Sequence, residues 1–222
     1  MMRIAVALSG RGSNLEALHQ ALKREAAAKI LVVISDRADA GGLDLARRWG
    51  VATEVLPQPA DGALWLAILR RYAVDFVVLA GYVKLVPANV VAAYRGRIVN
   101  VHPALLPAFG GQGMYGRRVH EAVLASGVRE TGATVHLVDE AYDHGATLAQ
   151  ARVPVLPGDT PEQLAHRVLE VEHQLLPAVV LAAARAGKAV PLAESGVRSQ
   201  ESGSSRTSDP RLQTPSSRLP SS

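Results

Sequence analysis

Short aliphatic runs alternate with longer amphipathic segments along residues 3–190. Uninterrupted Val, Ile, Leu and Ala runs predict strands that are buried on both faces, as in a parallel sheet covered by helices. We predict such strands at Arg3–Leu8, Ile30–Ser35, Ala52–Leu56, Asp75–Leu79 and Ile98–Val101. The segments between them carry apolar residues at helical spacing and predict helices at Asn14–Ala28, Gly42–Gly50, Leu64–Tyr72 and Pro87–Tyr94.

The pattern changes after the fifth of these strands. A helix is predicted at Arg118–Ser126, and two further strands, Thr131–Val138 and Leu148–Leu156, are joined by a polar loop. A long final helix is predicted at Pro161–Ala186, with Thr160 as its N-cap. The predicted fold is therefore a doubly wound α/β domain over residues 1–190, with a mostly parallel sheet and a C-terminal antiparallel strand extension.

Ser, Pro and Arg dominate residues 191–222, where large apolar side chains are scarce. Such a composition cannot bury enough apolar surface to offset the entropy of ordering, so we expect a disordered tail. The chain has no Cys, which excludes disulfides and thiolate metal sites. No apolar run is long enough for a signal sequence or a membrane span, and we expect a cytoplasmic protein that does not bind membranes.

The formal net charge of +4 comes partly from the tail. No basic stripe interleaved with aromatic residues is present, so we expect no nucleic-acid partner. A mildly positive body suits small anionic substrates. In a doubly wound sheet, ligands bind at the carboxyl ends of the strands, which here places candidate loops at residues 9–14, 80–86 and 100–116.

The first candidate loop, Ser9–Asn14, reads SGRGSN and leads from a buried strand into a helix. Glycines allow a tight turn, and the free N–H groups at the start of the helix favour a phosphate. The loop is not a Walker A motif, and it matches only half of the dinucleotide fingerprint, since Leu15 stands where the third Gly belongs. Two alternatives remain open here: a dinucleotide site with Asp36 as the ribose-binding acid, and a tight turn without a ligand.

The second constellation is Asn100-Val101-His102-Pro103. Strand alternation points Asn100 and His102 to the same side, where an amide and an imidazole can stabilise an oxyanion and move a proton. The alternative is a capping Asn beside an exposed His. A carboxylate from the acidic loop 139–143 could support the imidazole, but spacing cannot choose among Asp139, Glu140 and Asp143.

The remaining histidines give weaker signals. His136 lies within a predicted strand and is interpreted as structural rather than as a ligand. The seven His residues show no metal-binding spacing, so we predict no metal site.

Four segments, in this order, carry a family resemblance: SGRGSN, LAGYVKLVP, NVHPALLP and VHLVDEAYDHG. Together they resemble the phosphoribosylglycinamide formyltransferases, and the resemblance covers residues 3 to about 186. It implies a Rossmann-like fold. It also implies transfer of a formyl group from the co-substrate 10-formyltetrahydrofolate to the amino group of glycinamide ribonucleotide, a step of purine (IMP) biosynthesis, without a metal.

The resemblance also assigns roles to residues. The family's catalytic Asn, His and Asp match Asn100, His102 and Asp143. The substrate phosphate would bind at Gly12, Ser13 and Asn14, and Glu172 would bind the ribonucleotide. The folate pocket would consist of Val83, Lys84, Leu85, Val86, Asn100 and the backbone of residues 137–143.

Three features depart from the family pattern. Residues 57–66 contain no Arg for the folate tail, residues 108–117 are unusually Gly-rich and are expected to form a mobile lid, and His144 follows the catalytic Asp. Rival functions are a formyl-folate deformylase or an initiator-tRNA formyltransferase, which usually carry an added domain, and a non-catalytic nucleotide- or phosphate-sensing domain. The last would bind without turnover and would not depend on His102.

Overall fold

A computed structural model describes residues 1–192 of the chain. It contains one sheet with the strand order β3-β2-β1-β4-β5-β6-β7, in which β1 to β5 are parallel and β6 and β7 are antiparallel. The strands are β1 (Met2–Leu8), β2 (Ala28–Ser35), β3 (Ala52–Val55), β4 (Phe76–Leu79), β5 (Ile98–His102), β6 (Glu130–Leu137) and β7 (Thr147–Pro154). The helices are α1 (Ser13–Arg24), α2 (Gly41–Arg48), α3 (Gly62–Arg71), α4 (Ala88–Ala93), α5 (Arg117–Ser126) and α6 (Pro161–Ala186).

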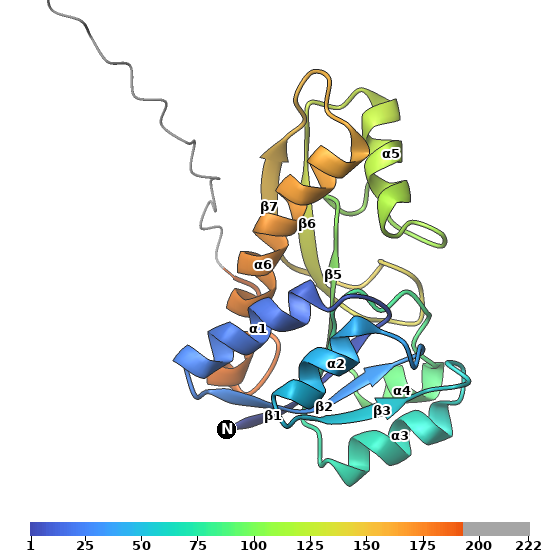
Figure 1. The fold of residues 1–222 in the computed structure, drawn as a ribbon, viewed down its shortest axis with the longest axis vertical. Helices are drawn as coiled ribbons and strands as arrows, with labels where there is room; N and C mark the ends of the chain where they lie inside the picture. Colours follow the sequence, from blue (N-terminus) through green and yellow to red (C-terminus); the bar gives the residue numbers. More distant parts are fainter. Residues whose placement is uncertain (193–222) are drawn as a thin grey trace, which may run out of the picture.

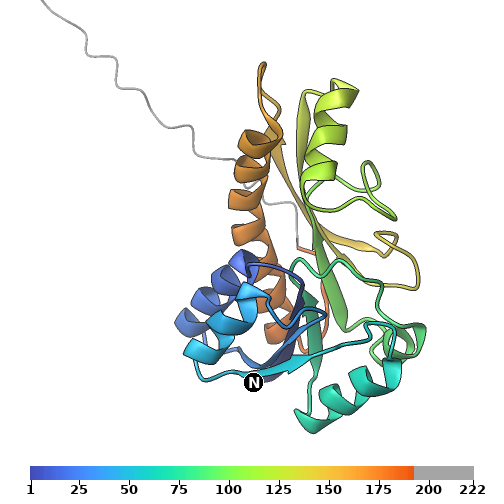
Figure 2. The ribbon, with the colours of Figure 1, turned by 45° about the vertical axis from the view of Figure 1, so that its right-hand side comes forward.

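Helices cover both faces of this sheet, and alternate residues of its strands explain why (Figures 1 and 2). In β1, Ile4, Val6 and Leu8 pack in a core with α1, α2 and α6, whereas Ala5 and Ala7 pack in a second core with α3 and α4. A strand buried on both faces needs apolar residues at every position, which is the pattern of the sequence. The predicted fold class, a Rossmann-like doubly wound sheet with an antiparallel extension, is confirmed.

Element ends differ from the predicted ones in a few places. The first helix ends at Arg24 rather than continuing to Ala28, because Ala28 pairs with Met2 at the start of β2. Sheet pairing here outweighs the helix propensity of the intervening alanines. Strand β5 extends one residue further than predicted, to His102, and Pro87 caps α4 rather than forming its first residue.

The predicted N-cap of the long helix α6 is confirmed. The Thr160 side chain accepts a hydrogen bond from the Gln163 N–H, and the Thr160 N–H donates to the Gln163 side-chain oxygen, which together form a capping box. Among residues 1–192, no helix is long and apolar enough to cross a membrane. Of the predicted disordered tail, residues 193–222 lie outside the described residues, whereas the N–H of Leu192 donates to the Leu148 carbonyl at 2.9 Å.

Candidate active site

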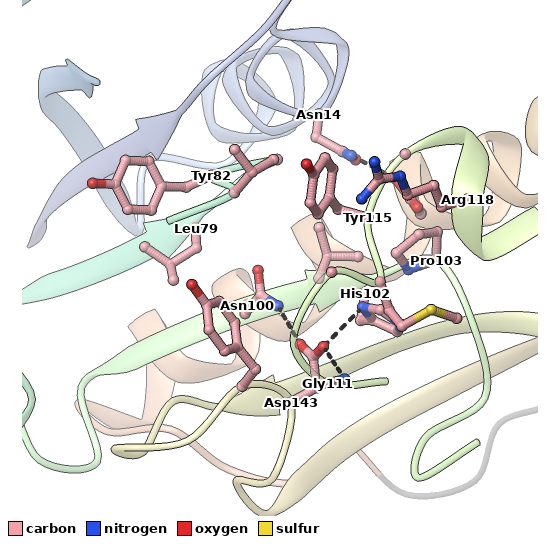
Figure 3. Close-up of a pocket in the computed structure, with 18 of the residues that line it drawn as sticks. Asn14, Leu79, Tyr82, Asn100, His102, Pro103, Gly111, Tyr115, Arg118 and Asp143 are labelled. Atoms are coloured by element: carbon pink, nitrogen blue, oxygen red, sulfur yellow. Dashed lines mark hydrogen bonds and ion pairs between the residues drawn. The ribbon is translucent and has the colours of Figure 1, made fainter. Parts of the chain in front are cut away.

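The carboxyl end of β5 presents two polar side chains to one cavity. Asn100 is partly buried, and His102 is only 3% exposed. Both side chains line a cavity of about 670 Å³, which lies at the carboxyl ends of the parallel strands (Figure 3). This is the position at which doubly wound folds bind their ligands.

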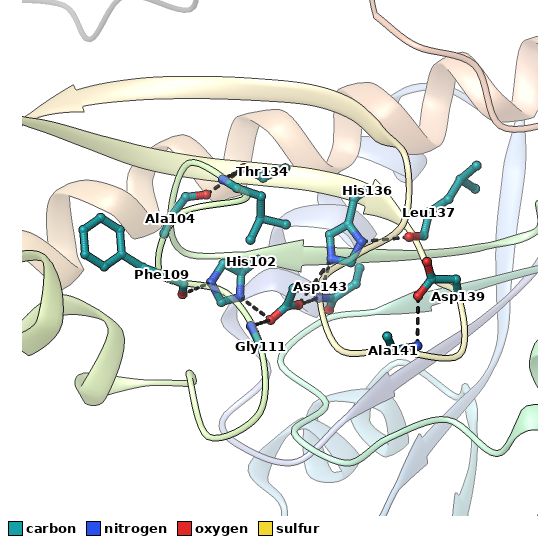
Figure 4. Close-up of polar contacts among 12 residues, drawn as sticks. His102, Ala104, Phe109, Gly111, Thr134, His136, Leu137, Asp139, Ala141 and Asp143 are labelled. Carbon is teal, nitrogen blue, oxygen red and sulfur yellow. Dashed lines mark hydrogen bonds and ion pairs between the residues drawn. The ribbon is translucent and has the colours of Figure 1, made fainter.

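Asp143 joins this pair from the loop between β6 and β7. Its Oδ2 lies 3.4 Å from His102 Nδ1 and accepts the Gly111 N–H at 3.0 Å, while its Oδ1 lies 3.4 Å from Asn100 Nδ2. Asp139 instead accepts the Ala141 N–H. Of the three acids that spacing left open, the structure therefore brings Asp143 to the imidazole (Figure 4).

Both ring nitrogens of His102 face acceptors. Nε2 lies 2.8 Å from the Phe109 carbonyl, which can only accept, so Nε2 carries a proton and donates it. Burial lowers the pKa of His102, while Asp143 and the Phe109 carbonyl raise it, and burial dominates. The protonated imidazolium is therefore stabilised by Asp143 and the Phe109 carbonyl but disfavoured by burial.

At the Asp143 carboxylate, unlike at His102, the neighbouring groups outweigh the effect of burial on the pKa. Burial raises its pKa, but the neighbouring His136 and His102 rings and the Gly111 N–H together hold the pKa below its ordinary value. Asp143 also has a left-handed backbone, with φ 59°, a conformation that Asp adopts more readily than most residues other than Gly. An ionised carboxylate is thus kept beside the imidazole.

His136 also belongs to this cluster, although its place within a predicted strand indicates only a structural role. Its Nδ1 donates to the Leu137 carbonyl at 2.8 Å, which leaves Nε2 to accept from Asn100 Nδ2 at 3.0 Å. His136 thereby orients the Asn100 amide. The signal that could have revealed it is the antiparallel register of β5 and β6, which places Asn100 directly opposite His136.

The other end of the cavity lies at the N-terminus of α1. Asn14 Nδ2 donates to Glu172 Oε2 at 2.6 Å, and both side chains are at least nine-tenths buried. The Asn14 Oδ1 is buried without a hydrogen-bond partner within the described chain. Burial raises the pKa of Glu172 to about 7, so this carboxyl group takes up or releases a proton near neutral pH.

The cavity wall includes most of the residues to which the sequence assigned a role. They are Ser13, Asn14, Val83, Lys84, Leu85, Val86, Asn100, His102, Asp143 and Glu172. Gly12 is not on the wall, because it packs against Gly42, where a Cβ atom would lie 2.7 Å from the Gly42 Cα. Gly12 therefore shapes the turn, and Ser13 and Asn14 face the cavity. Of the loop 137–143, the wall includes Val138, Ala141, Tyr142 and Asp143.

The cations on the cavity wall are Arg11, Lys84, Arg117 and Arg118. Arg117 is paired with Glu121 and Glu162, whereas Arg118 lies over the Tyr115 ring. Residues 57–66, which follow β3 and include the start of α3, contain no Arg and contribute no residue to the wall, whereas Lys84 lies on the loop that follows β4. Within residues 1–192, no group of three His, Asp or Glu residues is placed to hold a metal ion.

Comparison with known proteins identifies the family. A sequence profile described as formyl transferase matches residues 2–180, which is most of the chain. The chain belongs to the formyl transferase family. A formyl transferase of Arabidopsis thaliana, named phosphoribosylglycinamide formyltransferase, chloroplastic, is 46% identical over 186 residues, covering 80% of this chain and 64% of that protein. This chain thus spans slightly less than two thirds of that relative.

Two further formyl transferases support the assignment. The phosphoribosylglycinamide formyltransferase of Escherichia coli (strain K12) is 37% identical over 187 residues, covering 81% of this chain and 85% of that protein. A crystal structure of phosphoribosylglycinamide formyltransferase from Anaplasma phagocytophilum superposes with a TM-score of 0.78 at 40% identity, covering 83% of this chain and 87% of that one. The fold described above is therefore the fold of this enzyme family.

Proposed function

We propose that this chain transfers the formyl group of 10-formyltetrahydrofolate to the amino group of N1-(5-phospho-D-ribosyl)glycinamide, a step of purine biosynthesis. One observation carries the proposal: Asn100, His102 and Asp143 converge in a cavity whose other end is the start of α1. The first three groups suit acyl transfer, and the helix N-terminus suits a phosphate. Relatives named for this activity support the choice of substrates.

The chemistry proposed is direct transfer between two bound substrates. The ribonucleotide would lie along Ser13, Asn14 and Glu172, with Gly12 shaping the turn below its phosphate. The folate would lie along Val83–Val86 and the loop that carries Asp143. Holding the amine against the formyl carbon replaces a bimolecular encounter by an intramolecular one, which supplies a large part of the rate.

The amine then attacks the formyl carbon and forms a tetrahedral oxyanion. The Asn100 amide, oriented by His136, and the His102 imidazolium donate to that oxygen. The negative charge raises the pKa of His102, which burial lowers in the free protein. Asp143 stabilises the imidazolium and passes the proton of the amine towards the departing folate nitrogen.

Turnover with purified protein tests this proposal. Release of tetrahydrofolate is followed with and without the ribonucleotide, for the wild type and for His102→Ala. The control is His166→Ala, since His166 lies exposed on α6 and pairs only with Glu170. We expect turnover that requires the ribonucleotide, survives in the control and falls by at least about a hundredfold in His102→Ala.

The other outcomes identify the rivals. Formate release without ribonucleotide would indicate a deformylase. Ribonucleotide binding without turnover, unaffected by His102→Ala, would indicate a sensing domain and overturn the proposal.

A further inference from the structure

The backbone of residues 109–111 holds both catalytic candidates at once. The Phe109 carbonyl accepts from His102 Nε2 at 2.8 Å, and two residues later the Gly111 N–H donates to Asp143 Oδ2 at 3.0 Å (Figure 4). The same Asp143 oxygen lies 3.4 Å from His102 Nδ1. The loop, the carboxylate and the imidazole therefore form a closed ring of polar contacts.

The close approach of the loop occurs at a glycine, Gly110. A Cβ atom on Gly110 would lie 2.5 Å from a methyl group of Leu106 and 3.2 Å from the Asp143 Cβ. The Leu106 methyl can rotate away, but the Asp143 Cβ is fixed to the backbone. Phe109 itself has a left-handed backbone, with φ 58°, which costs free energy that the surrounding contacts must offset. Residues 109–111 thus make specific contacts with His102 and Asp143 and do more than connect β5 to α5.

We propose, on the basis of the formyl transfer inferred above, that Phe109–Gly111 is a positioning element that fixes His102 through Nε2 and so presents Nδ1 to the formyl group. Two backbone groups, the Phe109 carbonyl and the Gly111 N–H, and one missing side chain thereby determine which nitrogen of the catalytic imidazole reacts. No side chain of the segment takes part, which is why sequence motifs do not reveal it.

The two ring nitrogens are held unequally. The contact at Nε2 is short and its partner is a carbonyl, so the proton on Nε2 stays there in both the neutral and the charged ring. The contact at Nδ1 is 3.4 Å, longer than a normal charge-assisted hydrogen bond. Nδ1 is therefore the nitrogen that becomes protonated when the ring is charged. It faces the side of the cavity that Asn100 and Asp143 line.

Several charged or titratable groups surround the ring. Asp143 in the β6–β7 loop raises the pKa of His102, whereas His136 on β6 lowers it, and His120 on α5 lies close enough for His102 to lower the pKa of His120. The Phe109 carbonyl raises the pKa of His102 and is the contribution that the loop controls. A small shift of the loop that lengthens this hydrogen bond while the ring stays buried therefore lowers the pKa of His102 further.

The variant Gly110→Ala tests the proposal. Its control is Gly41→Ala at the start of α2, which adds the same methyl group at a glycine without a left-handed backbone, where the nearest atom would lie 3.5 Å away. Because transfer needs the protonated ring, its rate falls as pH rises through the pKa of His102. We expect Gly110→Ala to lower kcat about tenfold, and to move this decline about half a pH unit lower, with KM for the ribonucleotide nearly unchanged. Gly41→Ala should leave the pH of the decline where it is.

A second measurement needs no loop variant. In wild-type protein labelled with ¹⁵N-histidine, the His102 signal is assigned as the one missing from His102→Gln. We expect Nε2 to stay protonated through the titration while Nδ1 changes. A neutral ring protonated on Nδ1, or a Gly110→Ala profile identical to that of an active wild type, would overturn the inference. An inactive wild type would instead count against the proposed function.

Discussion

Glu172 on α6 accepts a hydrogen bond from Asn14 on α1 at 2.6 Å across 158 residues of sequence, and no cation pairs with it in the described chain. Burial raises the pKa of Glu172 from 4.5 to about 7. The folded state therefore binds this proton more tightly than the unfolded state does. Its contribution to stability is fully present below pH 4.5 and is lost as pH rises through about 7.

The isosteric change Glu172→Gln should consequently stabilise the free protein at alkaline pH. We expect a gain of about 3 kcal/mol in the free energy of unfolding at pH 8 and almost none at pH 4, measured by urea titration. The same variant should bind the ribonucleotide at least about tenfold more weakly at pH 8, because the ionised carboxylate is lost. Equal stability of wild type and variant at both pH values would show that burial does not raise the pKa of Glu172.

The variant Asp143→Asn removes the negative charge of the carboxylate and keeps nearly the same side-chain shape. The amide can still lie beside His102, but it no longer favours the imidazolium, so the pKa of His102 falls. We expect kcat to fall about a hundredfold or more while the folate still binds. The matched control is Asp39→Asn, an exposed carboxylate that pairs with Arg37 at the surface. A loss of activity shared by the control would point to instability rather than to chemistry.

Lys84 lies on the cavity wall and is the positively charged residue of the proposed folate pocket, Val83–Val86. We expect Lys84→Gln to raise KM for the formyl donor about threefold to tenfold, and more for a donor with several glutamates than for one with a single glutamate. Steady-state kinetics with the two donors provide the measurement, and the exposed Lys29→Gln serves as the control. An equal change for both donors would place Lys84 away from the glutamate tail.

The turn before α1 depends on contact as well as on backbone conformation. Gly12 and Gly50 both have left-handed backbones, with φ values of 87° and 69°, but only at Gly12 would a Cβ meet another backbone, 2.7 Å from the Gly42 Cα. We expect Gly50→Ala to cost about 1 kcal/mol and Gly12→Ala about 3 kcal/mol or more in the free energy of unfolding. Similar losses from the two variants would mean that α2 moves aside easily.

Much of the fold could be predicted because β1, β2 and β4 are buried on both faces, and such strands stand out as apolar runs. Asn100 and His102 could be found because both are near one strand end and share a face. The sequence pattern predicts the end of α1 four residues too late, because the pairing of Ala28 with Met2 is set by the sheet and not by local propensity.

Features that depend on register or on backbone contact could not be predicted. The position of His136 beside Asn100 follows from the β5–β6 register, and no local pattern encodes it. The choice of Asp143 over Asp139 follows from the path of a loop. The contacts of Phe109 and Gly111 use main-chain atoms, which every residue possesses. Side-chain identity carries no information about such contacts.

The cavity is assembled from segments at both ends of the described chain. Ser13 and Asn14 precede the second strand, whereas Glu172 comes from the last helix and Asp143 from the antiparallel extension. Neither half of the chain can therefore hold a complete site. A chain cut in the loop between β5 and α5 would separate His102 from Asp143, and recovery of the site on mixing the two fragments would report their reassembly.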